Sequence, residues 1–249
     1  MPTIQMLLSP AAGKRLIATA LASREDVLTA LREHTVVIVA GSTNSYLAEQ
    51  LLRSIGEEGF EPRGFYRGLL RGKELAQSVK PRDEDIVIHK GVWQKGQTVY
   101  DAAPGLGKDD IIFKGANAVH LPTGTAGVLI GNPTSGTMAP ITAAVIGRRV
   151  RLFHPVGVEK RVETPVPELA ALCNAPEGGG FRLYPSAGEP YTELDALRDL
   201  CGVSARIISG GGVAGYEGCV LLLCEGSRET VGKCGKLSQM LSKTPRYQI

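Results

Sequence analysis

Several residue types are scarce in this chain of 249 residues, and each scarcity excludes a class of function. Aromatic residues make up only 5%, which argues against the stacking platforms that bind single-stranded nucleic acid. The net charge is +3, from 28 basic and 25 acidic residues. This excess is too small for the electrostatic footprint of a nucleic-acid-binding protein. We therefore expect no nucleic-acid partner.

Long apolar runs are also missing. The longest are far shorter than the roughly 20 residues that a helix needs to cross a bilayer, so we expect no membrane partner. Residues 1–10 lack the basic start and the apolar core of a signal peptide. A cytoplasmic location is the expectation that follows.

Metal-binding patterns are absent as well. The cysteines and histidines are Cys173, Cys201, Cys219, Cys224 and Cys234, with His34, His89, His120 and His154. No two cysteines form a C-x-x-C pair, which favours reduced thiols in the core over a disulfide or metal framework. The histidines show no zinc-ligand spacing. We expect no metal site, and no motif indicates a bound cofactor.

The segment 35–52 carries the strongest functional signal in the sequence. An apolar, β-branched run ends at a turn of small residues, and a helical pattern begins at once. This arrangement places backbone N–H groups, two hydroxyls and a helix N-terminus at the edge of a sheet, where phosphate or carboxylate groups bind. Four residues of this turn are expected to contact such an anion: Gly41, Ser42, Thr43 and Asn44. The plainer alternative is that a hydroxyl only caps the helix.

Strands and helices alternate along the first two thirds of the chain. Strands are expected at 35–40, 86–88, 111–113, 128–130 and 151–156, and helices at 23–34, 44–55 and 140–146. The strands are apolar on both faces, which is typical of a mostly parallel sheet covered by helices on both sides. The sequence thus predicts a Rossmann-type α/β domain over residues 1–162.

The pattern changes near residue 162. Strands are expected at 181–184, 205–209 and 219–224, and helices at 192–200 and 227–241. This order is typical of a small α+β domain of the ferredoxin-like, split βαβ type. We therefore predict a second domain over residues 163–249, which caps the cleft or mediates a homo-oligomer.

Two short units share one pattern: an acid, an apolar strand and then Lys-Gly. They span 85–91 and 110–115, so Lys90 and Lys114 each end a strand. If both strands end at the edge that carries the Gly41 turn, the two lysines converge on one anion. Lysines that simply reach solvent are the alternative.

Two glycine-containing loops resemble nucleotide-binding motifs only in part. The loop 131–137 has the spacing of the two P-loop glycines, but a threonine replaces the lysine that triphosphate chemistry needs. Four of its residues are nonetheless expected to hold an anion, unless the loop is a plain connection: Thr134, Ser135, Gly136 and Thr137. The segment 210–215 matches G-x-G-x-x-G, but a strand follows it, so a hairpin or bulge is expected.

A basic stretch follows the helical pattern at 44–55. Arginines recur there at four-residue intervals, at Arg63, Arg67 and Arg71. Such spacing is typical of one solvated basic face.

The order of these motifs resembles a known superfamily. A strand, the Gly41-Ser42-Thr43 turn and a helix are followed by strands that end near Lys114-Gly115-Ala116-Asn117 and Val156-Gly157-Val158-Glu159-Lys160. This order is similar to that in the superfamily of ribose-5-phosphate isomerase, glucosamine-6-phosphate deaminase, CoA transferases and the sensor domains of sugar-responsive repressors. The likeness covers about residues 30–162. It implies that the first turn binds the substrate phosphate and that Lys114 belongs to a lysine-glycine loop near the substrate.

The chain departs from this superfamily in its acidic residues. Ribose-5-phosphate isomerase carries an Asp-Gly-Ala-Asp-Glu segment after a central strand, where this chain has Lys114-Gly115-Ala116-Asn117. A neutral amide cannot act as the general base that enolisation requires. The nearby residues that we nominate as substitutes are Asp101, His120 and Glu159.

The sequence therefore predicts a protein that binds a small phosphorylated or carboxylated metabolite at the carboxyl ends of its strands. Lys90 and Asn117 complete the expected binding set. If the chain is an enzyme, the resemblance implies cofactor-independent isomerisation of a sugar phosphate, with Lys114, Asp101 and Glu159 as catalytic residues. The alternative is a non-catalytic metabolite sensor or assembly subunit that keeps the pocket without a general base.

Overall fold

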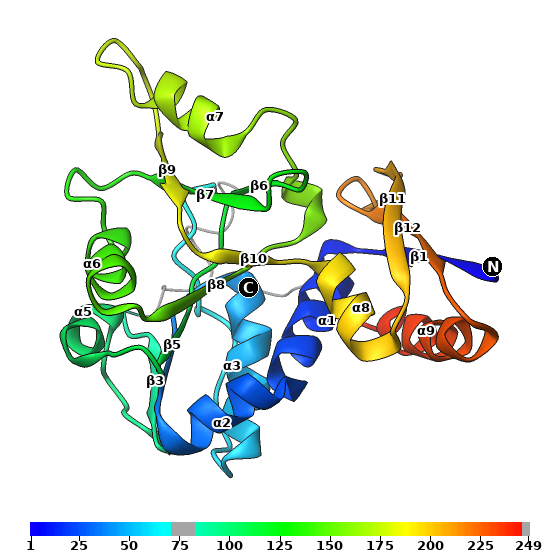
Figure 1. Ribbon diagram of the computed structural model, residues 1–249, viewed down its shortest axis with the longest axis horizontal. Helices are drawn as coiled ribbons and strands as arrows, with labels where there is room; N and C mark the ends of the chain where they lie inside the picture. Colours follow the sequence, from blue (N-terminus) through cyan, green and yellow to red (C-terminus); the bar gives the residue numbers. More distant parts are fainter. Residues whose placement is uncertain (71–82, 246–249) are drawn as a thin grey trace.

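The computed structural model describes residues 1–70 and 83–245, and their arrangement is shown in Figure 1. These residues form one six-stranded mixed sheet and two three-stranded sheets. Helices cover both faces of the six-stranded sheet (Figure 1): α1 (Pro10–Ser23), α2 (Glu25–Glu33) and α3 (Ser42–Ser54) lie on one face, and α5 (Val99–Ala102) and α6 (Met138–Arg148) on the other. The α/β class predicted from the sequence is confirmed.

The main sheet has the strand order β10-β8-β5-β2-β3-β4. Its strands are β2 (Thr35–Ile38), β3 (Ile86–His89), β4 (Val92–Trp93), β5 (Ile111–Phe113), β8 (Arg151–Pro155) and β10 (Glu189–Tyr191). β2, β5, β8 and β10 run parallel, whereas β3 runs antiparallel to β2 and β4 antiparallel to β3. The carboxyl ends of the four parallel strands therefore lie at one edge, where α3 begins directly after β2.

The main sheet is buried on both faces because successive side chains alternate between two cores. Val36 and Ile38 pack into the core beneath α1, α2 and α3, and Leu47 of α3 belongs to the same core. Val37 packs into the second core, together with Ile141 of α6. The continuous apolar run in the sequence reflects this double burial.

The strand β3 runs opposite to the direction that its sequence pattern suggested. Its register pairs His89, the last residue of β3, with Thr35, the first residue of β2. Lys90 and Gly91 then form a two-residue hairpin turn, with φ values of 49° and 76°, as type I′ turns require. Lys90 therefore lies at the opposite end of the sheet from the Gly41 turn and does not converge with Lys114.

Residues beyond 162 contribute strands to all three sheets. β9 (Arg182–Ser186) pairs with β7 (Thr125–Ile130), which pairs with β6 (Ala118–His120), and all these pairs are antiparallel. β10 extends the main sheet beside β8. β11 (Ser204–Gly210) and β12 (Val220–Glu225) form the third sheet with the N-terminal strand β1 (Thr3–Leu8). The strands expected to form a separate small domain thus pair with strands from the first part of the chain.

The remaining elements frame these sheets. They are η1 (Ala103–Gly105), η2 (Val158–Lys160), α7 (Val166–Cys173), α8 (Glu193–Cys201) and α9 (Arg228–Leu241). The glycine-rich segment after Gly210 joins the antiparallel neighbours β11 and β12, so the expected hairpin is confirmed. Within residues 1–70 and 83–245, no helix has the length and apolar character needed to cross a bilayer.

Candidate functional site

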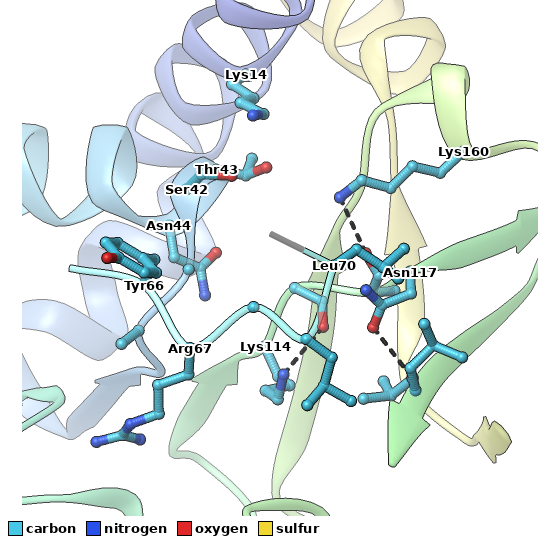
Figure 2. A pocket seen from close by; sticks show the side chains of 18 residues that line it. Lys14, Ser42, Thr43, Asn44, Tyr66, Arg67, Leu70, Lys114, Asn117 and Lys160 are labelled. Atoms are coloured by element: carbon cyan, nitrogen blue, oxygen red, sulfur yellow. Dashed lines mark hydrogen bonds between the residues drawn. The ribbon is translucent and has the colours of Figure 1, made fainter. Parts of the chain in front are cut away.

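A cavity of about 240 Å³ lies at the edge where the parallel strands end. Its wall combines the turn after β2, the loop after β5 and the segment 66–70 with side chains of α1, β7 and η2 (Figure 2). Most of the polar groups expected from the Gly41 turn and the lysine-glycine loop therefore meet in one place. The lining comprises Lys14, residues 40–44, 66–70 and 114–117, Val128, Leu129 and Lys160.

The first turn of α3 directs backbone N–H groups toward this cavity. The first helical hydrogen bond runs from Ser45 N to Gly41 O, at 2.8 Å. The N–H groups of Ser42, Thr43 and Asn44 therefore have no acceptor within the helix. Gly41 occupies the N-cap position and no side chain caps the helix, so the alternative of a capping hydroxyl does not apply. These N–H groups and the helix dipole together favour an anion.

Asn44 fixes the geometry of this turn. Its Nδ2 donates hydrogen bonds to Val39 O at 2.7 Å and to Phe113 O at 3.0 Å, which joins the ends of β2 and β5. The reverse orientation of the amide would set Oδ1 against two carbonyl oxygens, so the assignment is unambiguous. Asn44 is fully buried, and its Oδ1 has no hydrogen-bond partner among the described residues. A ligand that carries a hydrogen-bond donor would satisfy this oxygen.

Three lysines from different parts of the fold reach the cavity: Lys14 of α1, Lys114 after β5 and Lys160 of η2 (Figure 2). Lys114 Nζ donates a hydrogen bond to Gly115 O at 3.3 Å, and Lys160 Nζ donates one to Ala116 O at 3.0 Å. Both acceptors are neutral carbonyls, and the described lining contains no carboxylate. All the charged side chains of the described lining are therefore basic.

Burial and the nearby charge of Lys160 lower the pKa values of Lys14 and Lys114. Burial lowers the pKa of Lys114 to about 8. The charge of Asp85 opposes this decrease, and the charges of Lys160 and Arg67 add to it. Burial also lowers the pKa of Lys14, and Lys160 contributes in the same direction. A bound anion would raise both pKa values, because an opposite charge nearby favours the protonated amine.

Two carboxyl groups lie beside the lysines but outside the described lining. Glu193, at the start of α8, is 1% exposed, and its Oε2 accepts a hydrogen bond from Val158 N at 2.8 Å. Burial raises the pKa of Glu193 to about 8, and the nearby charge of Glu159 adds to the increase. Both acids act electrostatically on Lys14. The structure thus places Glu159, a nominated catalytic residue, next to the amines rather than in the wall of the cavity.

Asp85 supports the turn from the other side. It is fully buried, and it accepts hydrogen bonds from Ala40 N at 2.9 Å and from Val99 N at 2.8 Å. Arg67, which lines the cavity, forms an ion pair with it at 2.7 Å. Arg67 is therefore part of the site and not of a solvated basic face, whereas Arg71 lies outside the described residues. The antiparallel direction of β3 is what brings Asp85 to this edge.

The loop 131–137 lies beside a second cavity, also of about 240 Å³, which shares Lys114 with the first. Three of the expected residues line this second cavity: Ser135, Gly136 and Thr137. Thr134 lies outside the lining of both cavities, and its backbone N–H and hydroxyl bind Asn132 Oδ1 instead. The loop is thus near Lys114, but it is not part of the cavity formed by the α3 turn.

The other nominated residues have structural contacts. Asp101 completes a capping box in α5, where its Oδ2 accepts hydrogen bonds from Thr98 N and Oγ1 at 2.8 and 2.6 Å. His120 hydrogen-bonds within the turn that follows its own strand. Neither residue lines the two cavities. Asn117 does line the first cavity, and its Oδ1 accepts a hydrogen bond from Leu129 N at 3.0 Å.

No motif in the sequence singles out Lys14, although a local signal for its helix is present. Ser9 caps α1 by accepting a hydrogen bond from Ala12 N at 3.2 Å, and Pro10 occupies the first turn. A serine followed by proline is a typical helix start. The signal predicts the helix that carries Lys14, but it does not predict that α1 packs against α3, a long-range contact that includes the hydrogen bond from Gln50 to Thr19.

Comparisons with protein-family models, with curated proteins and with solved structures found no match to this chain. Its function is therefore inferred from the geometry of the site.

Proposed function

We propose that this chain binds a small phosphorylated or carboxylated metabolite in the cavity beside the α3 turn. The observation that carries this proposal is that Lys14, Lys114 and Lys160 line the same cavity as a helix N-terminus whose first N–H groups have no acceptor within the helix. Ammonium groups and helix N-termini are the groups with which proteins bind phosphate and carboxylate. The described lining itself contains no carboxylate that would repel such an anion.

The remaining lining supports a ligand with more than an anionic group. The buried Oδ1 of Asn44 calls for a hydrogen-bond donor, which a hydroxyl group supplies. Val128 and Leu129 offer apolar surface to a carbon skeleton. The cavity volume of about 240 Å³ suits a small metabolite. A sugar phosphate meets these requirements together.

The arrangement of the main sheet supports a Rossmann-type architecture similar to that of the isomerase-like superfamily. Four parallel strands lie between two helical layers, and the cavity is at their carboxyl edge, where ligands of open α/β sheets bind. If the chain is similar to this superfamily in function, the turn after β2 binds the phosphate group of the ligand.

Catalysis and sensing differ in one requirement within this proposal. Isomerisation of a sugar phosphate needs a group that moves a proton. The absence of a carboxylate from the described lining favours a non-catalytic sensor or assembly subunit. The lowered pKa of Lys114 and the raised pKa of Glu193 favour an enzyme, because groups that titrate near neutral pH exchange protons readily.

A thermal-shift titration tests binding. Ribose 5-phosphate at about 100 times its dissociation constant should stabilise the fold by about 2.7 kcal/mol, which raises the melting temperature by roughly 5 °C or more in a chain of this size. Neutral ribose should cause no shift. Lys114→Ala and Lys160→Ala should lose most of the shift, whereas Lys90→Ala, at the opposite end of the sheet, should retain it. The proposal fails if phosphorylated and carboxylated compounds all leave the parent unchanged, or if the cavity variants respond like Lys90→Ala.

A proton-NMR assay of the parent separates the two forms of the proposal. Conversion of ribose 5-phosphate to its ketose by the parent, and not by Lys114→Ala, would support the enzyme. Binding without conversion would support the sensor.

A further inference from the structure

Lys114 occupies a position in the cavity different from that of the other two lysines. In Figure 2, Lys14 and Lys160 lie toward one side, with Lys14 near Ser42 and Thr43, and Lys114 lies across the open space. The charges separate Lys14 from Lys114, because Lys14 is not among the charges that act on Lys114, whereas Lys160 acts on both of these amines. The cavity therefore has an anion-binding side at Lys14, Ser42 and Thr43, and the amine of Lys114 lies across the open space from it.

The amine of Lys114 is not held by an acid. Its only described hydrogen bond is the long one to Gly115 O, at 3.3 Å, and it forms no ion pair with any residue in the described ranges. Asp85, the carboxylate that acts on it most strongly, already accepts hydrogen bonds from two backbone N–H groups and from Arg67. Leu69, Val128 and Leu129 supply apolar surface to the same cavity. Such surroundings leave a lysine amine free to act as a nucleophile.

We infer that Nζ of Lys114 forms an imine with the carbonyl carbon of its ligand, so that the metabolite is a small aldehyde or ketone that carries a phosphate or carboxylate. This inference rests on the proposed function, because the anion-binding side at Lys14, Ser42 and Thr43 would hold the charged group and direct the carbonyl group to Lys114. The neutral fraction of the amine is substantial near pH 8, since burial, Lys160 and Arg67 lower its pKa against the opposing effect of Asp85.

The reaction balances without a further reagent. The lone pair of Nζ attacks the carbonyl carbon and forms the C–N bond, while the C=O π electrons move to the oxygen, which takes up one amine proton. The resulting carbinolamine loses its hydroxyl group with the second amine proton as water, and the C=N bond forms. One amine and one carbonyl compound thus yield one imine and one water, with no change in oxidation state.

Reduction with sodium borohydride tests the inference on the intact chain. The parent is incubated at pH 8 with a phosphorylated ketone, dihydroxyacetone phosphate, or with a carboxylated ketone, pyruvate. It is then reduced. We expect an adduct whose added mass is that of the carbonyl compound less one oxygen atom. Peptide mapping should place it on Lys114 at least tenfold more than on the exposed Lys90. Glycerol 3-phosphate and lactate, which have the same charged groups and no carbonyl, should give no adduct.

Variants complete the test. Lys114→Arg keeps a positive charge but stays protonated, so its adduct should fall to the level of the carbonyl-free controls, whereas Lys90→Arg should be labelled like the parent. Mapping of the adduct to Lys14 or Lys160 would overturn the assignment. No adduct on a parent that glycerol 3-phosphate still stabilises against heat would overturn the imine and leave the proposed function intact. The absence of both adduct and stabilisation would overturn the proposed function itself. If Lys114→Arg does not fold, the peptide map of the parent decides.

Discussion

His154 shows how one buried side chain orders the backbone next to Lys114. Its Nδ1 lies 2.6 Å from Lys114 O, and its Nε2 lies 2.6 Å from Ser186 Oγ. A carbonyl oxygen can only accept, so Nδ1 carries the proton and the neutral Nε2 accepts a hydrogen bond from the Ser186 hydroxyl. Burial lowers the pKa of His154 to about 4. The ring is therefore neutral at physiological pH, and it acts by positioning the loop after β5.

The lowered pKa of His154 predicts a loss of stability in acid. The unfolded chain takes up a proton on this histidine below pH 6.5, whereas the folded chain does so only near pH 4. Stability is therefore lost as pH falls from 6.5 to 4, and the contribution of His154 between pH 7 and pH 5 is about 2 kcal/mol. Urea unfolding at these two pH values measures it.

The variant His154→Asn isolates this contribution. Its amide nitrogen can donate to Lys114 O, but it does not titrate in this range, so the variant should lose about 2 kcal/mol less than the parent between pH 7 and pH 5. The comparison with the variant is needed because Glu193, whose pKa is raised to about 8, has the opposite effect: its contribution increases as pH falls from 8 to 4.5. Equal pH dependence in parent and variant would contradict the assignment of the neutral ring.

The two Lys-Gly units show which features of the elements could be predicted from the sequence. The strand, turn and helix from β2 to α3 depend on local signals, and the turn lies where those signals indicated. The units that end in Lys90 and Lys114 have the same local pattern, yet one strand is antiparallel and the other parallel to β2. Strand direction is set by pairing across the sheet and by the hairpin that follows Lys90, so the pattern alone could not separate the two lysines.

Asp85 gives a test at the scale of elements, because it connects β3, the end of β2 and the start of α5. Asp85→Asn keeps the shape but removes the charge, and its NH₂ group would face a backbone N–H or the Arg67 guanidinium. We expect a loss of about 3 kcal/mol in the free energy of unfolding, and a smaller thermal shift with ribose 5-phosphate, because Ala40 loses its anchor. Urea unfolding and thermal-shift titration measure the two effects.

Asp101→Asn is the matched control for this prediction. Asp101 is an exposed carboxylate that caps α5 from outside the cavity. Its replacement should reduce stability less than Asp85→Asn does and should leave the thermal shift with ribose 5-phosphate unchanged. If both variants behave alike, the buried contacts of Asp85 do not stabilise the fold and the turn at Ala40 more than an exposed helix cap does.

The whole molecule explains why the cavity could be predicted only in part. Lys14 follows a strand, β1, that pairs with β12 near the other end of the chain, and α1 packs between α3 and α8. Lys160 reaches the same cavity from η2, after β8. Contacts between residues so distant in sequence depend on the complete fold. Hydrophobic periodicity and turn chemistry report only on neighbours, so they could place Lys114 and Gly41 but not the other two lysines.

The same long-range pairing makes a prediction for the fragment 1–162, which the sequence pattern proposed as a domain. Without the rest of the chain, β1 loses β12, β7 loses β9 and β8 loses β10. Met6 and Leu16 would remain in a first core that lacks its members Leu197 and Leu222. We expect the fragment to show no cooperative urea transition, whereas the full chain should give coincident transitions by the fluorescence of its single tryptophan, Trp93, and by far-UV circular dichroism. A cooperative transition of the fragment would instead establish 1–162 as an independent domain, because only a self-sufficient core unfolds in that way.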